Sequence, residues 1–520
     1  MKINEIMSRR EMKIFLTVFL AMATFIQVYG VNANSHLDLT RSIVDHGTLN
    51  IDAVHNNTGD RSKYKGHYYS DKAPGLSLIN VPLYFTWKNV YGLFGNTEIG
   101  KKPRKQLFKA NNVSITAPEE PGDFYLSSLI LMVLFSSTLP VAILSVLFYR
   151  VAGTILEDEV KKLLVTFGFS FGTLITHYGT DLFPDAMATL LAFSSFYLLY
   201  FWKDHPGKRK MIFAGLLGGI AVIVNTLTGI VLVFNAVYAL WKYEKLPVYY
   251  TLGGFIGGLP FMIYNTLVFG APWNLPRSYL DPVLWKNLQN NIGFRFGILR
   301  NAMVSFRILF MPYRGIFYWF PLLLLALLGY REFYGRERKT ALIAAVILIS
   351  SILMVSSWWA WWHGGWFGER HLVFTMPFFI FPVAYAVKEI DMKLLGALVT
   401  ISVLVNLAGY HGGYEDSLKS LQNSSTMKES KQMQLYSLKP LGNPLKEYYV
   451  PGLAENGVNS QLFDGLYSGR MPDIRTYADS GQSSPLFLII WYLILVPLAI
   501  WNREIRDILD SHRKILEDPS

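Results

Sequence analysis

The sequence predicts an all-α integral membrane protein with about twelve transmembrane helices. Of its 520 residues, 52% are hydrophobic and only 16% are charged, and the mean hydropathy is +0.27. One or two soluble cores cannot bury that much apolar surface. The chain contains no cysteine, which excludes disulfides, thiolate metal sites and cysteine catalysis. We attribute the net charge of +11 to Lys and Arg on cytoplasmic loops, and we expect a lipid bilayer rather than nucleic acid around this protein.

The first apolar run covers residues 14–31 and follows four basic residues. Because basic residues stay inside, we expect this helix to lead to the external face. Val31-Asn32-Ala33 also fits a signal-peptidase site, but the run is longer than a signal core of about 7–15 residues. A long external segment follows at residues 32–122. In it we expect an amphipathic stretch from His36 to His46 and a helix from Leu76 to Phe94 that lies in the membrane interface.

Further apolar runs have about the length of a bilayer core or fall slightly short of it. They are Tyr125–Tyr149, Leu163–Tyr178, Pro184–Trp202, Val248–Phe269, Ile316–Leu328, Thr340–Ser357, Leu372–Val387, Leu394–Tyr410 and Leu486–Trp501. The stretch from Met211 to Trp241 is predicted to be two short spans, broken between Asn225 and Gly229. A single helix there would place the basic loop at residues 331–339 outside, although basic loops stay in the cytoplasm.

With an even number of spans, both termini lie in the cytoplasm. The external segments are then residues 32–122, 270–315, 359–370 and 411–484. We expect residues 1–410 to form one transmembrane module with its interfacial helices in the first external loop. Residues 411–484 are predicted to be an external loop or small cap, and residues 485–520 a last span with a basic cytoplasmic tail.

The segment from Lys63 to Gly75, with the sequence KYKGHYYSDKAPG, concentrates ionisable and aromatic groups between two apolar runs. It indicates either a site containing His67, Tyr69, Asp71 and Lys72 or a solvated loop with interfacial tyrosines. If Asp71 pairs with Lys72, its pKa should be lowered, which suits orientation of a phosphate or a metal ion. A less paired carboxylate would then be the better general base, and Asp38 and Asp60 are the candidates in this loop.

The other external polar groups favour an anionic ligand. The second external loop carries five arginines against a single lysine: Arg277, Arg295, Arg300, Arg307 and Arg314. Guanidinium groups bind phosphate in a bidentate manner, although each arginine is also compatible with a contact to lipid head groups. The run from Trp358 to Trp366 is either an interfacial belt or a sugar-stacking surface, with Arg370 facing phosphate. Asp185 is either a functional acid at the membrane boundary or an exposed helix N-terminal residue.

The order of these motifs resembles the GT-C superfamily of membrane glycosyltransferases. The shared features are the long first external loop with Asp71-Lys72 and Pro74, an acid at the start of a later helix, Asp185, and a late Phe367-Gly368-Glu369-Arg370. The sequence is most similar to the branch of protein O-mannosyltransferases and lipid A aminoarabinose transferases. The resemblance covers most of residues 12–410 and rests on motif order and sidedness, because each motif is short.

The resemblance implies an inverting enzyme of the plasma (inner) membrane that moves a sugar from a polyprenyl-phosphate carrier to an external acceptor. A carboxylate of the first external loop would act as base, and cations would hold the lipid phosphate. The chain departs from the pattern near Asn34, where the family has an acid. No cofactor is certain, and a divalent ion held by Asp71 and His67 is one option. A lipid-linked saccharide flippase and a polysaccharide polymerase or ligase are the alternative functions.

Overall fold

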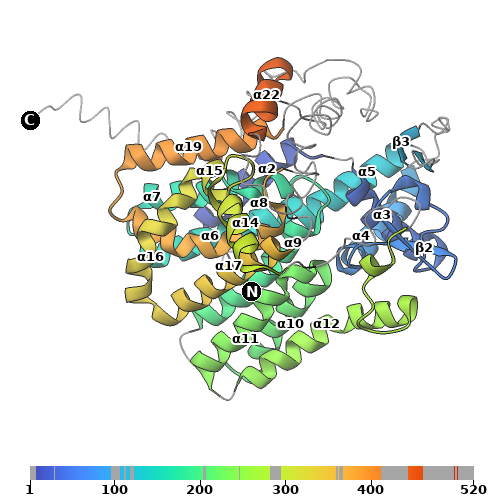
Figure 1. Cartoon of the computed structure of the whole chain (residues 1–520), viewed down its shortest axis with the longest axis horizontal. Coiled ribbons are helices and arrows are strands. Elements are labelled where there is room, and N and C mark those ends of the chain that lie inside the picture. Colours follow the sequence, from blue (N-terminus) through green and yellow to red (C-terminus); the bar gives the residue numbers. More distant parts are fainter. Residues whose placement is uncertain are drawn as a thin grey trace, which may run out of the picture.

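The computed structural model shows a bundle of helices with two short β-hairpins (Figure 1). The structure describes residues 7–27, 30–94, 106–110, 113–116, 122–202, 206–244, 246–281, 294, 296–358, 361, 367–410, 443–458, 460, 497, 500 and 501. Most of the predicted external segment 411–484 and of the last span therefore lie outside the described residues. The prediction of a helical membrane protein is confirmed by the helical content and by five helices that are long and apolar enough to cross a membrane.

Those five helical stretches match four of the nine further apolar runs and the second of the two short spans predicted between Met211 and Trp241. They are Phe124–Ile155, Thr226–Tyr243, Pro247–Phe269, Arg338–Ser357 and Arg370–Val387. Met392–Ala408 is a shorter apolar helix. The total of about twelve spans stays a prediction, because other predicted runs form shorter or interrupted helices within the described ranges. One such run divides into α7 (Glu159–Phe171) and α8 (Leu174–Tyr178).

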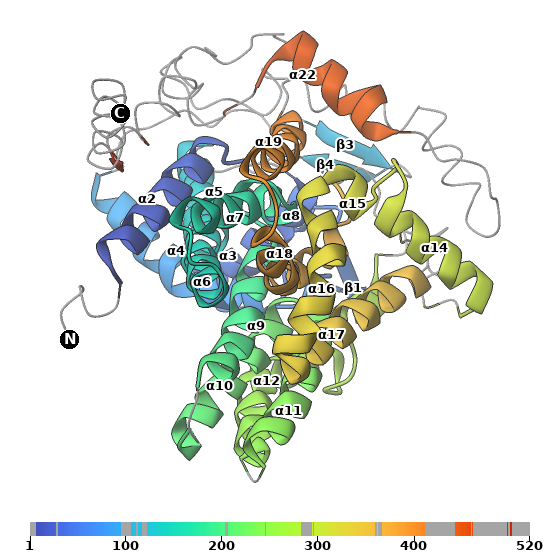
Figure 2. The same ribbon diagram turned by 90° about the vertical axis from the view of Figure 1, so that its left-hand side faces the viewer.

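The break predicted near Asn225 is present. Helix α10 (Lys208–Val224) ends there, the Asn225 side chain accepts a hydrogen bond from the Leu227 backbone N–H, and α11 (Gly229–Tyr243) follows one 3-10 turn later. Helix α12 (Pro247–Phe269) returns against α10, and the three extend together from one side of the bundle (Figure 2). A Cβ on Gly219 would lie 2.2 Å from the Gly254 carbonyl oxygen, so the contact between α10 and α12 requires glycine.

The centre of the bundle is the segment that follows Arg370. It forms a 3-10 stretch (Arg370–Phe379) that continues into α18 (Ile380–Val387), and all eight residues of α18 are buried. Its neighbours are α6 (Leu139–Ile155), α7, α9 (Pro184–Phe201), α16 (Leu325–Arg336) and α17 (Arg338–Ser357). Because α18 is apolar and buried on every side, it fixes the position of the 3-10 stretch that leads into it. The first residues of that stretch, Arg370 and His371, carry polar side chains.

The basic segments predicted to be cytoplasmic meet at one end of the bundle. Arg10, at the start of α2 (Arg9–Thr24), lies 2.9 Å from Glu159 of α7. The Lys161 side chain donates to the Lys388 carbonyl at 2.9 Å, and Lys388 in turn lies 3.4 Å from Glu332 of α16. The chain thus gathers these loops on one side, as the parity argument requires.

The segment predicted to be the first external one contains two helices and two hairpins. Helix α3 (Val31–His46) starts five residues earlier than the predicted amphipathic stretch, and α4 (Gly75–Phe94) matches the predicted interfacial helix. Between them lies an antiparallel hairpin of β1 (Arg61–Tyr64) and β2 (His67–Ser70). A second hairpin pairs β3 (Gln106–Ala110) with β4 (Val113–Thr116). Neither hairpin was expected from the sequence.

The remaining described elements complete the bundle and its outer layer. They are α5 (Gly122–Val133), α14 (Ile298–Phe310), α15 (Ile316–Trp319), α19 (Met392–Ala408) and α22 (Val450–Asn456). Helix α14 packs against α17, and α19 packs against α7.

Candidate functional site

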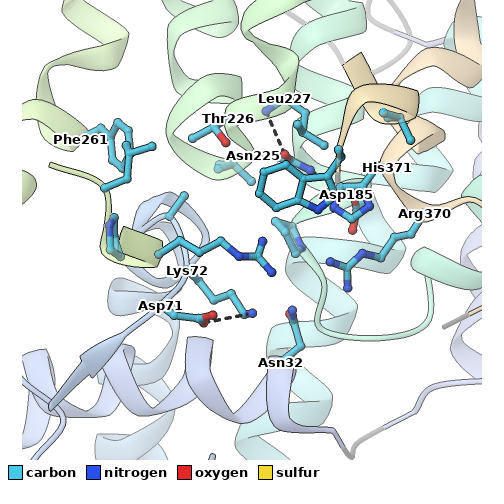
Figure 3. Close-up of a pocket in the computed structure, with 18 of the residues that line it drawn as sticks. Asn32, Asp71, Lys72, Asp185, Asn225, Thr226, Leu227, Phe261, Arg370 and His371 are labelled. Atoms are coloured by element: carbon cyan, nitrogen blue, oxygen red, sulfur yellow. Dashed lines mark hydrogen bonds and ion pairs between the residues drawn. The ribbon is translucent and has the colours of Figure 1, made fainter. Parts of the chain in front are cut away.

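Several separate parts of the chain line one cavity of about 280 Å³. Among them are α3, the Asp71-Lys72 turn, the start of α9, the break between α10 and α11, the loop after α12, the end of α17 and the start of the central segment at Arg370. Figure 3 shows the side chains of Lys72, Arg370 and Asn32 pointing into the space between these elements. Three cations line the cavity, Lys72, Arg277 and Arg370, together with two carboxylates, Asp71 and Asp185.

Lys72 forms ion pairs with two carboxylates at once. Its Nζ atom lies 2.8 Å from Asp60 and 3.0 Å from Asp71, and its side chain is 13% exposed. Burial raises the pKa of the Asp60 carboxyl, but Lys72 and then Arg277 and Arg370 outweigh it, so this pKa lies below its usual range. Burial also raises the pKa of Asp71, and here the neighbouring Asp60 adds to the effect, so this pKa lies above its usual range.

This result corrects the expectation for the pair. Asp71 is paired with Lys72 as predicted, but its pKa is raised because desolvation outweighs the single cation that it shares with Asp60. The carboxylate with the lowered pKa is Asp60, which does not line the cavity. The direction of the pKa shift of Asp71 is therefore opposite to the one expected from sequence.

The hairpin and the next helix hold the Asp71-Lys72 turn in place. The Lys65-Gly66 turn has positive φ angles of 48° and 90°, which reverses the chain between the strands. After β2, the Ser70 hydroxyl accepts a hydrogen bond from the Lys72 backbone N–H at 3.2 Å and lies 2.8 Å from the hydroxyl of Ser35 on α3. The Pro-Gly pair then starts α4, where Gly75 lies directly against the backbone at the end of α10.

Contacts with β1 bring Arg277 to the cavity. Arg61 forms a buried ion pair with Asp281 at 2.9 Å, and the Ser62 hydroxyl donates to the Pro276 carbonyl at 2.6 Å. The guanidinium of Arg277 lies 5.8 Å from the ring centre of Trp358, which also lines the cavity. The second external loop is therefore attached to the first, and this attachment places its arginine beside Lys72.

Asp185 and Arg370 come from the interior of the bundle. Asp185 is in the first turn of α9, after Pro184, and is 3% exposed. Its carboxylate accepts a hydrogen bond from the Asn225 amide at 3.1 Å, so the break in α10–α11 provides its partner. The Arg370 guanidinium lies 5.0 Å from the ring centre of Phe183. The interpretation of Asp185 as an exposed N-terminal residue is therefore wrong, since the residue is buried at the cavity.

Helix α3 contributes neutral polar groups that the sequence analysis did not identify. Asn32 and His36 line the cavity and are 3% and 0% exposed. They lie four residues apart and so occupy one face of α3. The only sequence signal for this pair is a polar i, i+4 spacing in a helix that was expected to be amphipathic. Asn34, at the position where the resemblance predicts an acid, does not line the cavity. Its amide donates a hydrogen bond to the Asn57 carbonyl and accepts one from the Tyr125 hydroxyl.

Several predicted site residues lie away from the cavity. Asp38 is fully buried, accepts a hydrogen bond from Asn57 at 3.1 Å and does not line the cavity. Tyr69 packs edge-on against Phe269. Residues of the second external loop differ as well: Arg300 on α14 donates to the Ser356 and Trp358 carbonyls, and Arg307 is half-buried on the same helix. Arg295 and Trp366 lie outside the described residues. Phosphate-binding roles for these arginines stay predictions.

The metal pair considered as an option, Asp71 with His67, does not form. His67 is exposed, hydrogen-bonds to Asp52 at 2.6 Å and begins β2, whereas Asp71 follows the other end of that strand and pairs with Lys72. Among the described residues there is no group of three His, Cys, Asp or Glu side chains that could hold a metal ion. The residues present at the cavity thus do not fit a protein-held divalent ion, and we derive no step through one.

The fold and the site define a helical, multi-pass membrane protein with a cavity of three cations and two carboxylates at one end of its bundle. No protein-family model and no curated protein matches the chain. Among solved structures, similar ones are two crystal structures of ArnT from Cupriavidus metallidurans. The one bound to undecaprenyl phosphate has 13% identity and a TM-score of 0.43, and the apo one has 14% and 0.41. Each alignment covers 95% of this chain and 77% of the other, and at these TM-scores it supports no conclusion about function.

Proposed function

We propose that this protein is an integral membrane glycosyltransferase that moves a sugar from a polyprenyl-phosphate carrier to a hydroxyl of an external acceptor. The observation that carries the proposal is the convergence of Lys72, Arg277 and Arg370 with Asp71 and Asp185 on one cavity. These three cations come from three distant segments of the chain. Two of them, Arg277 and Arg370, are guanidinium groups, which favour a phosphate as the ligand.

The position of the cavity in the bundle supports a lipid-linked donor on the external face. Helix α9 starts at the cavity with Asp185 and ends near Tyr200, whose hydroxyl donates to Glu337 at 3.1 Å among the basic loops. Helix α17 runs in the opposite direction, from Arg338 to the cavity residue Trp358. The cavity and the basic loops therefore lie at opposite ends of the same helices. Since basic loops stay in the cytoplasm, the cavity belongs to the external side of the plasma membrane.

The reaction that these groups support is a direct displacement at the anomeric carbon. The acceptor hydroxyl loses its proton to a carboxylate while its oxygen forms a bond to the anomeric carbon. The bond between that carbon and the phosphate oxygen breaks, and the electron pair leaves with the polyprenyl phosphate. Lys72, Arg277 and Arg370 stabilise the charge that the phosphate gains. One displacement inverts the anomeric configuration.

Two carboxylates line the cavity and compete for the role of base. Asp71 has a raised pKa, which favours proton transfer, but it also lies 3.0 Å from the phosphate-binding candidate Lys72. Asp185 lines the cavity from a different element, where it can take the proton of an acceptor hydroxyl; the oxygen of that hydroxyl attacks the anomeric carbon from the side opposite the phosphate, as inversion requires. Asp60 and Asp38 do not line the cavity, and their positions support only structural roles.

A transfer assay with purified protein in proteoliposomes and a panel of polyprenyl-phosphate sugars tests the proposal. Lys72→Ala, Asp71→Asn and Asp185→Asn should each lower kcat/KM by about 10²-fold or more, because each removes a charge that acts in the transition state. Lys63→Ala is the matched control, since Lys63 is an exposed lysine on the same hairpin. Only the variant that lacks the base should recover with a more acidic acceptor hydroxyl.

The same preparation separates the proposed enzyme from its alternatives. A flippase would move the lipid-linked sugar across the bilayer without forming a glycosidic bond, and a polymerase or ligase would require a diphosphate-linked donor. Near-normal transfer by Lys72→Ala would show that the cation cluster is structural. Absence of transfer with every monophosphate donor, combined with transport or with use of a diphosphate donor, would replace the proposed function.

A further inference from the structure

The cavity has a second, neutral side that the displacement chemistry does not use. Asn32 and His36 form this side on α3, opposite in character to Lys72, Arg277 and Arg370. Within the described part of the chain, the Oδ1 atom of Asn32 and the Nε2 atom of His36 are buried and have no hydrogen-bond partner. Leaving buried polar atoms unsatisfied is costly, so their retention in a cavity wall points to a ligand that supplies the missing partners.

Contacts from α4 favour one position of the proton on the His36 ring. The Ser77 hydroxyl donates to the His36 carbonyl at 3.0 Å, and its oxygen lies 3.4 Å from His36 Nδ1. Because that hydroxyl has one proton, its oxygen is left to accept from Nδ1–H. The lone pair of the imidazole is then on Nε2. Thr40, whose hydroxyl donates to the His36 carbonyl at 2.9 Å, holds the same turn of α3.

His36 also stays neutral. Burial, with a further contribution from Lys72, lowers the pKa of His36 to about 3. A neutral imidazole with its lone pair on Nε2 repels phosphate oxygens and accepts a hydrogen bond from an O–H group. The cavity is therefore divided by chemistry. Its cations suit the phosphate of a carrier, and its α3 face suits the hydroxyl groups of the attached sugar.

We propose that His36 is a specificity-determining residue that accepts a hydrogen bond from one hydroxyl of the donor sugar, with the Asn32 amide contacting the same sugar. This inference rests on the proposed function, because it assigns the parts of a polyprenyl-phosphate sugar to two sides of one cavity. It differs from that function in its consequence. The cations determine whether the carrier phosphate binds, whereas His36 determines which sugar is preferred.

Binding measurements with the full-length protein in nanodiscs test the assignment without turnover. The probes are bare polyprenyl phosphate, a polyprenyl-phosphate hexose that the wild type transfers, and monodeoxy versions of that hexose. His36→Leu should weaken binding of the hexose lipid about tenfold and leave bare polyprenyl phosphate within twofold, because only the former supplies an O–H group. His36→Gln should restore most of the difference, since its amide oxygen can accept at a similar position.

The monodeoxy donors provide the decisive comparison. One of them should bind the wild type about tenfold more weakly than the full hexose lipid does. The same monodeoxy donor and the full hexose lipid should bind His36→Leu with equal affinity, which is the signature of a lost pairwise contact. His46→Leu, at the exposed end of the same helix, should change none of these values. A Ser77→Ala variant, which removes the Nδ1 contact, should reduce the same discrimination.

The outcomes separate this inference from the proposed function. If the wild type binds the hexose lipid better than the bare lipid and His36→Leu shows the same preference, the inference is wrong and the function stands. Equal weakening of both lipids by His36→Leu would show that His36 only supports the shape of the cavity, which also overturns it. If the wild type binds neither lipid, the proposed function and this inference fail together.

Discussion

Replacing Gly75 with alanine should inactivate the protein through one steric contact. A Cβ atom at this position would lie 2.4 Å from the carbonyl carbon and oxygen of Ile223 and 2.6 Å from the Val224 nitrogen. All three are backbone atoms at the end of α10, so no side chain can rotate away. Ordinary contact begins at 3.4 Å, and α4 must therefore move from α10 by about 1 Å.

That displacement acts on the site through a short connection. Lys72 precedes Gly75 by three residues, and its ion pairs of 2.8 and 3.0 Å with Asp60 and Asp71 leave little room for a shift. A misplacement of about 1 Å in a catalytic group can cost about 10²-fold in rate. The substitution does not weaken the helix itself, because alanine has a higher helix propensity than glycine by about 1 kcal/mol.

The assay is sugar transfer in proteoliposomes, with the amount of folded protein measured by size-exclusion chromatography. Gly92→Ala is the matched control, since it is in the same helix and a Cβ there would meet nothing within 4 Å. We expect Gly75→Ala to lower kcat about 10²-fold and Gly92→Ala to leave it unchanged. A folded Gly75→Ala protein with kcat within threefold of wild type would refute the reasoning that the α4–α10 contact positions Lys72.

Three further predictions concern charge and sidedness. If Asp71 is the base it must be ionised, so activity should fall as the pH decreases through its raised pKa, at a higher pH than the usual value of about 3.9, and Asp71→Asn should remove this acid limb. Asp281→Asn should destabilise the protein by about 3–5 kcal/mol, because it leaves Arg61 buried without its ion pair, and should raise the donor KM. A cysteine at the exposed hairpin residue Lys65 should react with an impermeant reagent in intact cells, and one at Tyr334 should not.

Each of these has a control or a contrary outcome. If the fall in activity at low pH persists unchanged in Asp71→Asn, Asp185 rather than Asp71 is the base. Thermal unfolding measures the stability of Asp281→Asn and of a control variant, Lys88→Ala. Lys88→Ala breaks an ion pair with Asp45 in which Lys88 is 47% exposed, so it should cost less than about 1 kcal/mol. Labelling of the Tyr334 cysteine from outside would reverse the proposed sidedness.

The features that sequence predicted well depend on composition, on the charges of the loops and on residues adjacent in the chain. The break near Asn225 was predicted because a single span would reverse the sign of later loops, and the structure confirms it with a cap by the Asn225 side chain. The helix from Leu76 to Phe94 was expected because the stretch is too polar for a lipid-facing span, and a helix is present there as α4. The pairing of Asp71 with Lys72 was expected because the residues are adjacent, and the ion pair is present.

Only the tertiary structure decided how the acids differ and which polar groups share the cavity. The relative pKa values of Asp60 and Asp71 depend on burial and on a shared lysine, neither of which is encoded by neighbours in sequence. His36 became a candidate because α4 brings Ser77 against its ring and leaves Nε2 without a partner. Local patterns determine where helices form, whereas the charge and protonation of a site arise from side chains that only the packing of distant segments brings together.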